Sequence, residues 1–309
     1  MKPATNGDDR LHQLAVAVAS VFYGTIAVGG RYFVNSGFSL LEVSLTGVLF
    51  GALLLGPMIA VIPAYRPRAS DLGFFLLFGA AGAALQLTQF AGIVLGVPVA
   101  LVVLLLYSQP IWTVIFARVW LQEAITRRKL GSVLLAVLGT VVLFDPFGQI
   151  GDVSVAGLLA AMAGGLMLSL WVMFSRVSGL RGNPALTTTF GYTAFTAVWL
   201  LAAYPLVRAL LPEPAMSRLD PAVWARQWQA VAVYTLVGSV LPALLAMWGL
   251  RRVQASTAGI LLLLEPISAA VLAYLFFGES LTVGMWLGGG LILLSNVVLI
   301  GRGRGSESP

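Results

Sequence analysis

The segment Ser256–Phe277 reads STAGILLLLEPISAAVLAYLFF, and its only charged residue is Glu265. A helix of about 20 apolar residues is long enough to cross the hydrocarbon core of a bilayer. The segments Leu40–Ile62 and Leu186–Val207 are of similar length and also carry almost no charge. Backbone groups in lipid must be hydrogen-bonded within helices or a closed barrel, and these segments lack the alternating pattern of barrel strands. They therefore predict transmembrane helices.

The composition of the whole chain agrees with this prediction. Apolar residues make up 59% of the 309 positions, charged residues make up only 10%, and the mean hydropathy is +0.94. A soluble domain carries about 25% charged residues to solvate its surface. We therefore expect an all-α integral membrane protein whose solvent and partner is the lipid bilayer.

The hydropathy pattern predicts ten transmembrane helices. They are Leu14–Phe33, Leu40–Ile62, Leu72–Val94, Pro98–Trp120, Leu130–Phe144, Val155–Arg176, Ala185–Val207, Gln229–Leu250, Ser256–Phe277 and Thr282–Ile300. Before the eighth, Asp220-Pro221 predicts the start of a short helix, because aspartate caps helices and proline suits their first turn. We expect Trp224 and Trp228 to anchor that helix at the membrane surface. The single histidine, His12, is expected to be solvated in a polar N-terminal tail.

The basic residues predict the orientation of the chain. An even number of spans places both termini on one side of the membrane. Of the 18 lysines and arginines, fourteen fall in the tails and in the loops after even-numbered helices, and four fall in the opposite loops. By the positive-inside rule, both termini are expected in the cytoplasm of a bacterial cell, with the chain in its inner membrane. The net charge of +6 is interpreted in this way and not as nucleic-acid binding.

The two halves of the chain carry related sequences. The fourth and fifth helices align with the ninth and tenth at an offset of 156 residues, with twelve identities over the 39 positions of Leu105–Leu143. The matched residues that stand out are Pro110 with Pro266, Glu123 with Glu279 and Thr126 with Thr282. We therefore expect two five-helix repeats, 1–150 and 151–309. Because five is odd, the second repeat must enter the membrane upside down, and inverted repeats are typical of transporters with alternating access.

Several of these residues resemble a known family. The motifs are Leu264-Glu265-Pro266-Ile267, Gly278-Glu279-Ser280-Leu281-Thr282, Gln109-Pro110, Gln122-Glu123, Phe22-Tyr23-Gly24 and Leu170-Trp171. They look like the signatures of EamA-type domains of the drug/metabolite transporter superfamily, and within it the chain looks most like the bacterial aromatic amino-acid exporters. The resemblance covers nearly the whole chain and implies a ten-helix exporter built from two inverted five-helix repeats. It further implies export of small metabolites, with amino acids, and aromatic ones in particular, as substrates.

Glu265 is the only acidic residue deep inside a predicted span. A charge at that depth is expensive, so the side chain should face protein or a water-filled cavity. It is interpreted either as a proton-coupling or substrate-ammonium site or as a residue that caps the kink at Pro266. Pro110 and Pro266 each remove a backbone hydrogen bond and should kink their helices. Matched kinks in two repeats favour a hinge role.

Polar and aromatic side chains within the predicted spans are candidates for contact with a small-molecule substrate. Gln86 and Gln89 share one face of a helix, because residues three apart are neighbours there. Binding sites combine apolar walls with a few polar groups. The candidate substrate-binding residues are Tyr23, Gln86, Gln89, Tyr107, Gln109, Trp112, Trp171, Tyr192, Trp248 and Glu265, with Pro110 and Pro266 as hinges.

The sequence also disfavours several classes of protein. It contains no cysteine, so disulfides, thiolate metal sites and cysteine nucleophiles are excluded. Lysine occurs only at Lys2 and Lys129, which excludes a phosphate-binding glycine loop ending in lysine. We therefore expect no catalytic residue, metal or cofactor, and an intramembrane transferase is disfavoured. A passive channel and a multidrug exporter of cationic compounds stay open as alternatives. The run Gly288–Gly290 suits either intramolecular packing or a dimer, so a monomer and a homodimer are both open.

Overall fold

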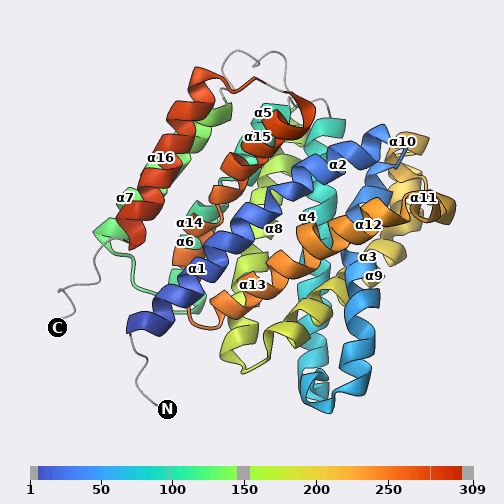
Figure 1. The fold of residues 1–309 in the computed structure, drawn as a ribbon, viewed down its shortest axis with the longest axis horizontal. Coiled ribbons are helices and arrows are strands. Elements are labelled where there is room, and N and C mark those ends of the chain that lie inside the picture. The colour runs from blue at the N-terminus through green and yellow to red at the C-terminus, as the bar shows by residue number, and fades with distance from the viewer. Residues whose placement is uncertain (1–5, 96, 98, 145–153, 279, 301–309) are drawn as a thin grey trace.

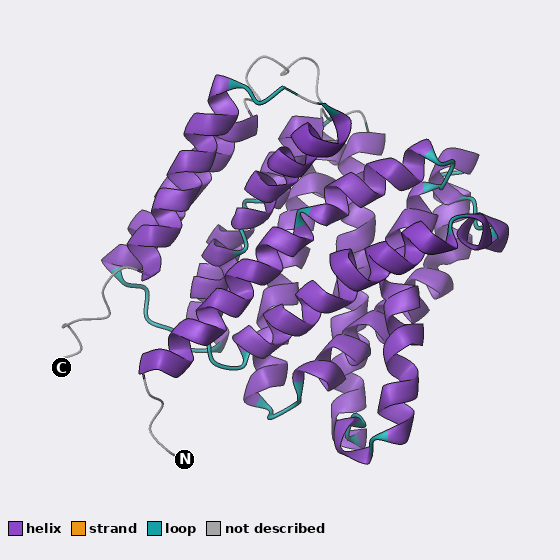
Figure 2. Cartoon of the chain, in the orientation of Figure 1, coloured by secondary structure: helices purple, strands orange, loops and turns teal. Residues whose placement is uncertain are grey.

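The computed structural model describes residues 6–95, 97, 99–144, 154–278 and 280–300 of the chain. All regular structure in this part of the chain is helical, with no strand (Figure 2). The predicted all-α architecture is therefore confirmed for these residues. Glu279, which the repeat alignment pairs with Glu123, lies outside the described residues.

The helices follow one another through short connections (Figure 1). In chain order they are α1 (Asn6–Tyr23), α2 (Thr25–Asn35), α3 (Leu40–Val61), α4 (Leu72–Val94), α5 (Val99–Leu106), α6 (Gln109–Trp120), α7 (Arg127–Phe144), α8 (Val155–Leu180), α9 (Ala185–Leu210), α10 (Pro214–Ser217), α11 (Pro221–Arg226), α12 (Trp228–Tyr234), the π-helix η4 (Thr235–Val240), α13 (Leu241–Leu250), α14 (Ala255–Leu261), α15 (Leu264–Phe277) and α16 (Val283–Ile300). Two 3-10 turns, η1 (Pro63–Tyr65) and η2 (Ala69–Asp71), connect α3 to α4.

Nine segments among the described residues are long and apolar enough to cross a membrane. They include every predicted span except the fifth, which is α7. Three of the 18 residues of α7, Arg127, Arg128 and Lys129, are basic and lower its apolar character. α7 packs along α16, and the start of α1 and the end of α16 lie at the same end of the bundle, as an even number of spans requires (Figure 1). A count of ten spans stays a prediction.

Two spans are broken where prolines were predicted to kink them. The residues between the paired helices are Tyr107 and Ser108 in the first break, and Leu262 and Leu263 in the second. Each break precedes a proline, because proline has no N–H to donate and its ring clashes with the preceding turn. The carbonyl of Leu262, to which residue 266 cannot donate, accepts a hydrogen bond from the Ser20 hydroxyl of α1 at 2.7 Å. The broken span is thereby tied to the first helix of the chain.

Several contacts between helices recur when each helix is replaced by the helix at the corresponding place in the other half of the chain. α1 packs against α13, and its counterpart α8 packs against α4. α1 also contacts α14 and α15, just as α8 contacts α5 and α6. α7 packs on α16 and α3 packs on α9, so each of these helices contacts its own counterpart. The division into two five-helix repeats stays a prediction.

The contact between α7 and α16 depends on small residues. A Cβ added at Gly139 would lie 2.8 Å from the carbonyl oxygen of Gly288 and 2.9 Å from the backbone nitrogen of Ile292. Glycines allow membrane helices to approach this closely. The first residue of the run Gly288–Gly290 therefore serves packing within the chain.

The loop between α9 and α12 contains the predicted short helix. Asp220 caps α11, and its side chain accepts a hydrogen bond from the N–H of Ala222 at 3.0 Å. The expectation that Trp224 is a membrane anchor is wrong, because its indole is buried and donates to the Thr46 hydroxyl at 2.9 Å. Trp228 is exposed, as an anchor requires.

Candidate functional site

The two broken spans meet at their breaks. Tyr107 from the first break and Leu263 from the second belong to the same buried cluster. Tyr107 also lies near enough to Glu265 for its hydroxyl to interact with the carboxyl group. Glu265 lies in the first turn of α15, where the helix N-terminus favours negative charge. The carboxyl group is therefore held at the point where the two halves of the chain touch.

An aromatic group from three other helices lies beside this contact. The ring of Trp171 on α8 makes edge-to-face contacts with Tyr23 of α1 and Tyr192 of α9, at centroid distances of 6.0 and 6.1 Å. Tyr23 is also near enough to Glu265 to interact with it electrostatically. Such arrangements place the positive edge of one ring on the negative face of another.

The two glutamines of α4 extend this group. Gln89 donates from Nε2 to Oε1 of Gln86 at 2.6 Å, which confirms that they share one helix face. Gln86 in turn interacts with the hydroxyl of Tyr192. Both glutamines are half-buried. The pair therefore offers amide groups next to the aromatic side chains.

Four side chains of this group remain partly accessible, whereas Tyr107, Trp171 and Tyr192 are buried. Tyr23, Gln86, Gln89 and Glu265 are only half-buried by exposed area. A side chain of this kind can contact a small solute that enters between the helices. Tyr23, Gln86, Gln89, Tyr107, Trp171, Tyr192 and Glu265 are the sequence candidates that the fold brings together.

Tyr234 is not among the residues predicted from the sequence, and it is near enough to Glu265 to interact with it electrostatically. Only aromatic residues well inside the predicted spans were selected as candidates. Tyr234 was left out because it lies close to the start of the predicted Gln229–Leu250 helix. The sequence feature that could have indicated Tyr234 is a set of glycines that leave room for its ring. Gly29, Gly47 and Gly238 all face Tyr234 closely.

Two further candidates on α6 make their contacts elsewhere. Gln109 is buried and donates from Nε2 to the hydroxyl of Thr113, which itself donates to the Ser169 hydroxyl at 3.0 Å. Trp112 donates from Nε1 to the Ser108 hydroxyl at 3.2 Å. These hydrogen bonds connect α6 to itself and to α8, so we do not include either residue in the candidate site.

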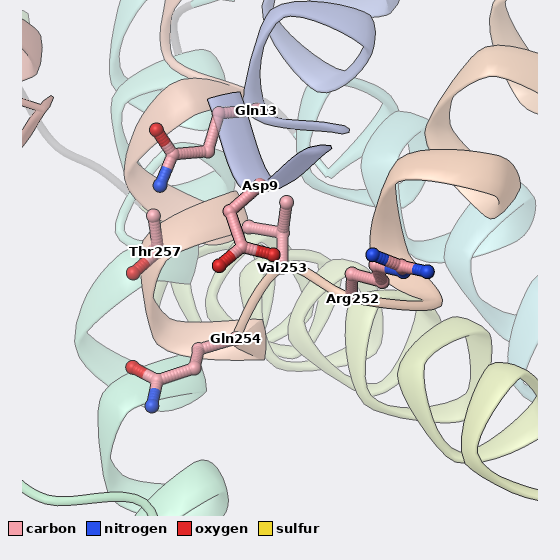
Figure 3. A pocket seen from close by; sticks show the side chains of 6 residues that line it. All are labelled: Asp9, Gln13, Arg252, Val253, Gln254 and Thr257. Atoms are coloured by element: carbon pink, nitrogen blue, oxygen red, sulfur yellow. The ribbon is translucent and has the colours of Figure 1, made fainter. Parts of the chain in front are cut away.

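Trp248 lies at the end of the bundle where α1 begins. Its ring stacks on His12 with centroids 4.1 Å apart. The expectation that His12 is a solvated tail residue is wrong, because α1 begins at Asn6 and carries the imidazole into a buried position. A pocket of about 250 Å³ opens beside this end of α1 (Figure 3), lined by Asp9, Gln13, Arg252, Val253, Gln254 and Thr257.

The described residues contain no group of three or more His, Cys, Asp or Glu side chains that could hold a metal ion.

The sequence model of the EamA-like transporter family matches residues 11–145 and, a second time, residues 155–301. The chain belongs to this family. An EamA-like transporter is a multi-pass membrane protein that moves solutes, so the chain is a transporter and not an enzyme.

Relatives of this EamA-like transporter share most of its length. A protein of Archaeoglobus fulgidus, named only as an uncharacterized transporter, is 27% identical over 292 residues, which are 92% of this chain and 94% of the relative. The threonine/homoserine exporter RhtA of Escherichia coli is 28% identical over 294 residues, which are 92% of this chain and 88% of RhtA. A solved crystal structure at 20% identity covers 94% of this chain and 96% of its own with a TM-score of 0.74, which shows a shared fold.

Proposed function

We propose that this transporter exports amino acids, with aromatic amino acids preferred. The observation that carries the proposal is the meeting of Glu265 and Tyr107 beside the rings of Tyr23, Trp171 and Tyr192. An amino acid presents an ammonium group, which a carboxylate attracts, and here Glu265 supplies that carboxylate. An aromatic substrate side chain would find aromatic walls next to it.

The substrate carboxylate requires hydrogen-bond donors, and the amides of Gln86 and Gln89 can supply them. One donor of Gln89 is already used by Gln86, which leaves other amide hydrogens for a ligand. The likeness to a threonine/homoserine exporter over 92% of the chain supports amino acids as the substrate class.

Alternating access is the mechanism that we propose for this export. The repeats 1–150 and 151–309 would lie in opposite orientations, and the broken spans at Pro110 and Pro266 would bend as hinges. The break at each proline and the exchange of helix contacts between the halves support this view. Both termini would face the cytoplasm of a bacterial cell, because fourteen of the 18 basic residues fall on that side.

Counterflow in proteoliposomes tests the proposal. Liposomes loaded with unlabelled phenylalanine should accumulate labelled phenylalanine, and tryptophan should compete more strongly than threonine or homoserine. Trp228→Phe changes an exposed aromatic outside the site and is the matched control for Trp171→Phe, which should weaken competition by aromatic substrates.

Each alternative has its own signature in this assay. Competition by threonine and homoserine alone would refute the aromatic preference and keep the amino-acid class. Transport of cationic dyes without any amino acid would replace the proposal by multidrug export. Flux that neither saturates nor shows trans-stimulation would indicate a passive channel.

A further inference from the structure

A buried carboxylate connects the two halves of the chain at one end of the bundle. Glu123 follows α6, and only 9% of it is exposed. Its carboxylate accepts hydrogen bonds from the backbone N–H groups of Ala255 at 2.7 Å and Ser256 at 3.1 Å, and also from the Ser256 hydroxyl. The first N–H groups of a helix have no partner within it. A residue of the first half therefore caps α14, the first part of the broken span in the second half.

Lys129 strengthens the same contact from α7. Its Nζ lies 3.8 Å from the Glu123 carboxylate and donates to the carbonyl of Ala124 at 3.0 Å and to Oε1 of Gln254 at 2.6 Å. A carboxylate withdrawn from water must be paired and hydrogen-bonded. Glu123 meets both conditions only while α14 stays in place, since three of its hydrogen bonds come from Ala255 and Ser256.

Behind this contact, α14 packs tightly on α6. Gly259 lies one turn further along α14 and faces Gln109 and Thr113. A Cβ added there would lie 2.8 Å from Nε2 of Gln109 and 3.2 Å from Cβ of Thr113. The break at Leu262 follows within the next turn, and Glu265 comes directly after it. The contact between α14 and α6 thus lies between Glu123 and the candidate substrate site.

The outer side of the contact lies where α1 begins. The pocket in Figure 3 is lined by Asp9 and Gln13 of α1 and by Gln254 and Thr257 at the start of α14. Gln254 is the residue that Lys129 holds. The pocket therefore reaches the outer face of the first turn of α14.

We propose that Glu123 is a positioning residue that closes the transport path at this end by holding the first turn of α14 against α6. It must release that turn when the path opens here. A solute that travels from this end to Glu265 requires α14 and α6 to separate at Gly259. Removing the carboxylate weakens only the closed arrangement, so it shifts the population toward the open one. The proposal goes beyond the choice of substrate, because it applies to any solute that takes this path.

The absence of cysteine from the sequence permits a direct test. Thr113→Cys places a near-isosteric thiol in the contact between α6 and α14. A membrane-impermeant maleimide, applied to inside-out and to right-side-out vesicles, reports how often water reaches that thiol from each side. We expect Glu123→Gln to raise the labelling rate about tenfold from one side only, since one hydrogen-bonded charge is lost from the closed state. The assay needs no substrate, so its result is independent of the amino-acid proposal.

Glu42→Gln in the same single-cysteine chain is the matched control. Glu42 is fully buried and accepts hydrogen bonds from the N–H groups of Ser39 and Asp220, both at 2.7 Å, but it lies at the start of α3 and holds the loop after α9. We expect unchanged labelling from either side. Equal increases in both variants, or no increase with Glu123→Gln, would overturn the proposal.

A second measurement leaves Glu123 intact and covers the case in which Glu123→Gln fails to fold. Spin labels at Ile125→Cys and Arg252→Cys, both exposed positions on either side of the contact, report the distance between the two loops in lipid nanodiscs. We expect a second, longer distance population besides the closed one. A single narrow population would show that these loops do not separate and would refute the proposal.

Discussion

Replacing Pro266 by alanine supplies a backbone N–H at a position where the chain now has none. Residue 266 lies four positions after Leu262, so the new donor can bond the Leu262 carbonyl and continue the helix through the break. At present that carbonyl accepts from the Ser20 hydroxyl at 2.7 Å and from the N–H of Glu265 at 3.1 Å. The substitution therefore makes the α14–α15 span straighter and favours whichever access state has the straighter span.

The size of the effect follows from one hydrogen bond. A net bond of this kind is worth about 1 kcal/mol, which changes a two-state population about fivefold. We expect Pro266→Ala to leave the protein folded and to slow transport by up to about fivefold. Pro110→Ala should act in the same direction at the other break.

Ser20→Ala tests the physical reason. If the Ser20 hydroxyl and the new N–H compete for one carbonyl, Ser20→Ala should destabilise the wild-type chain by about 1 kcal/mol and the Pro266→Ala chain by much less. Unfolding in mixed micelles measures the stabilities of the wild-type chain, the two single variants and the double variant. Counterflow measures their transport rates. Additive stabilities, or wild-type transport in both proline variants, would refute the hinge argument.

Three further outcomes are expected. Glu265→Gln should change the pH dependence of flux more than it changes folding, because an amide cannot exchange the proton that a carboxyl group can; an unchanged pH profile in a well-expressed variant would leave Glu265 a structural role only. Gln86→Leu and Gln89→Leu should depress phenylalanine and tryptophan flux and spare export of ethidium-type cations, which have no carboxylate to bind; equal loss of both activities in a resistance and counterflow comparison would contradict this. A reporter that is active only in the periplasm should be silent when fused after Pro309, and activity there would place the termini on the other side.

The positions of the broken spans could be predicted from the sequence because local chemistry and the repeat register both indicate them. Proline lacks a donor, so Pro110 and Pro266 weaken their helices locally. Pro57 and Pro205 lie inside the unbroken helices α3 and α9, so the match between Pro110 and Pro266 in the repeat register was needed to predict these two breaks. The Asp220-Pro221 start of α11 was predictable from local chemistry alone. Apolar length likewise predicted the membrane-spanning segments, since the bilayer thickness sets how many residues a span needs.

The partners of individual side chains were decided by the tertiary structure. Gln109 was predicted to contact the substrate, yet its amide donates within α6. Trp224 and His12 were placed in water or at the interface, yet both are buried against other helices. Glu42 was not predicted to be a buried acid, because it lies at the end of its span. One of its hydrogen-bond partners comes from the loop after α9.

The partners of side chains are hard to predict in a membrane protein because lipid is as apolar as the protein interior. In a soluble helix the apolar face identifies the core, whereas a membrane helix is apolar toward both lipid and protein, so its sequence fixes that it spans but not which face turns inward. The capping of α14 by Glu123 shows the same limit. The carboxylate and the helix start that it binds are 132 positions apart in the chain, and only the packing of one half on the other brings them within hydrogen-bonding distance.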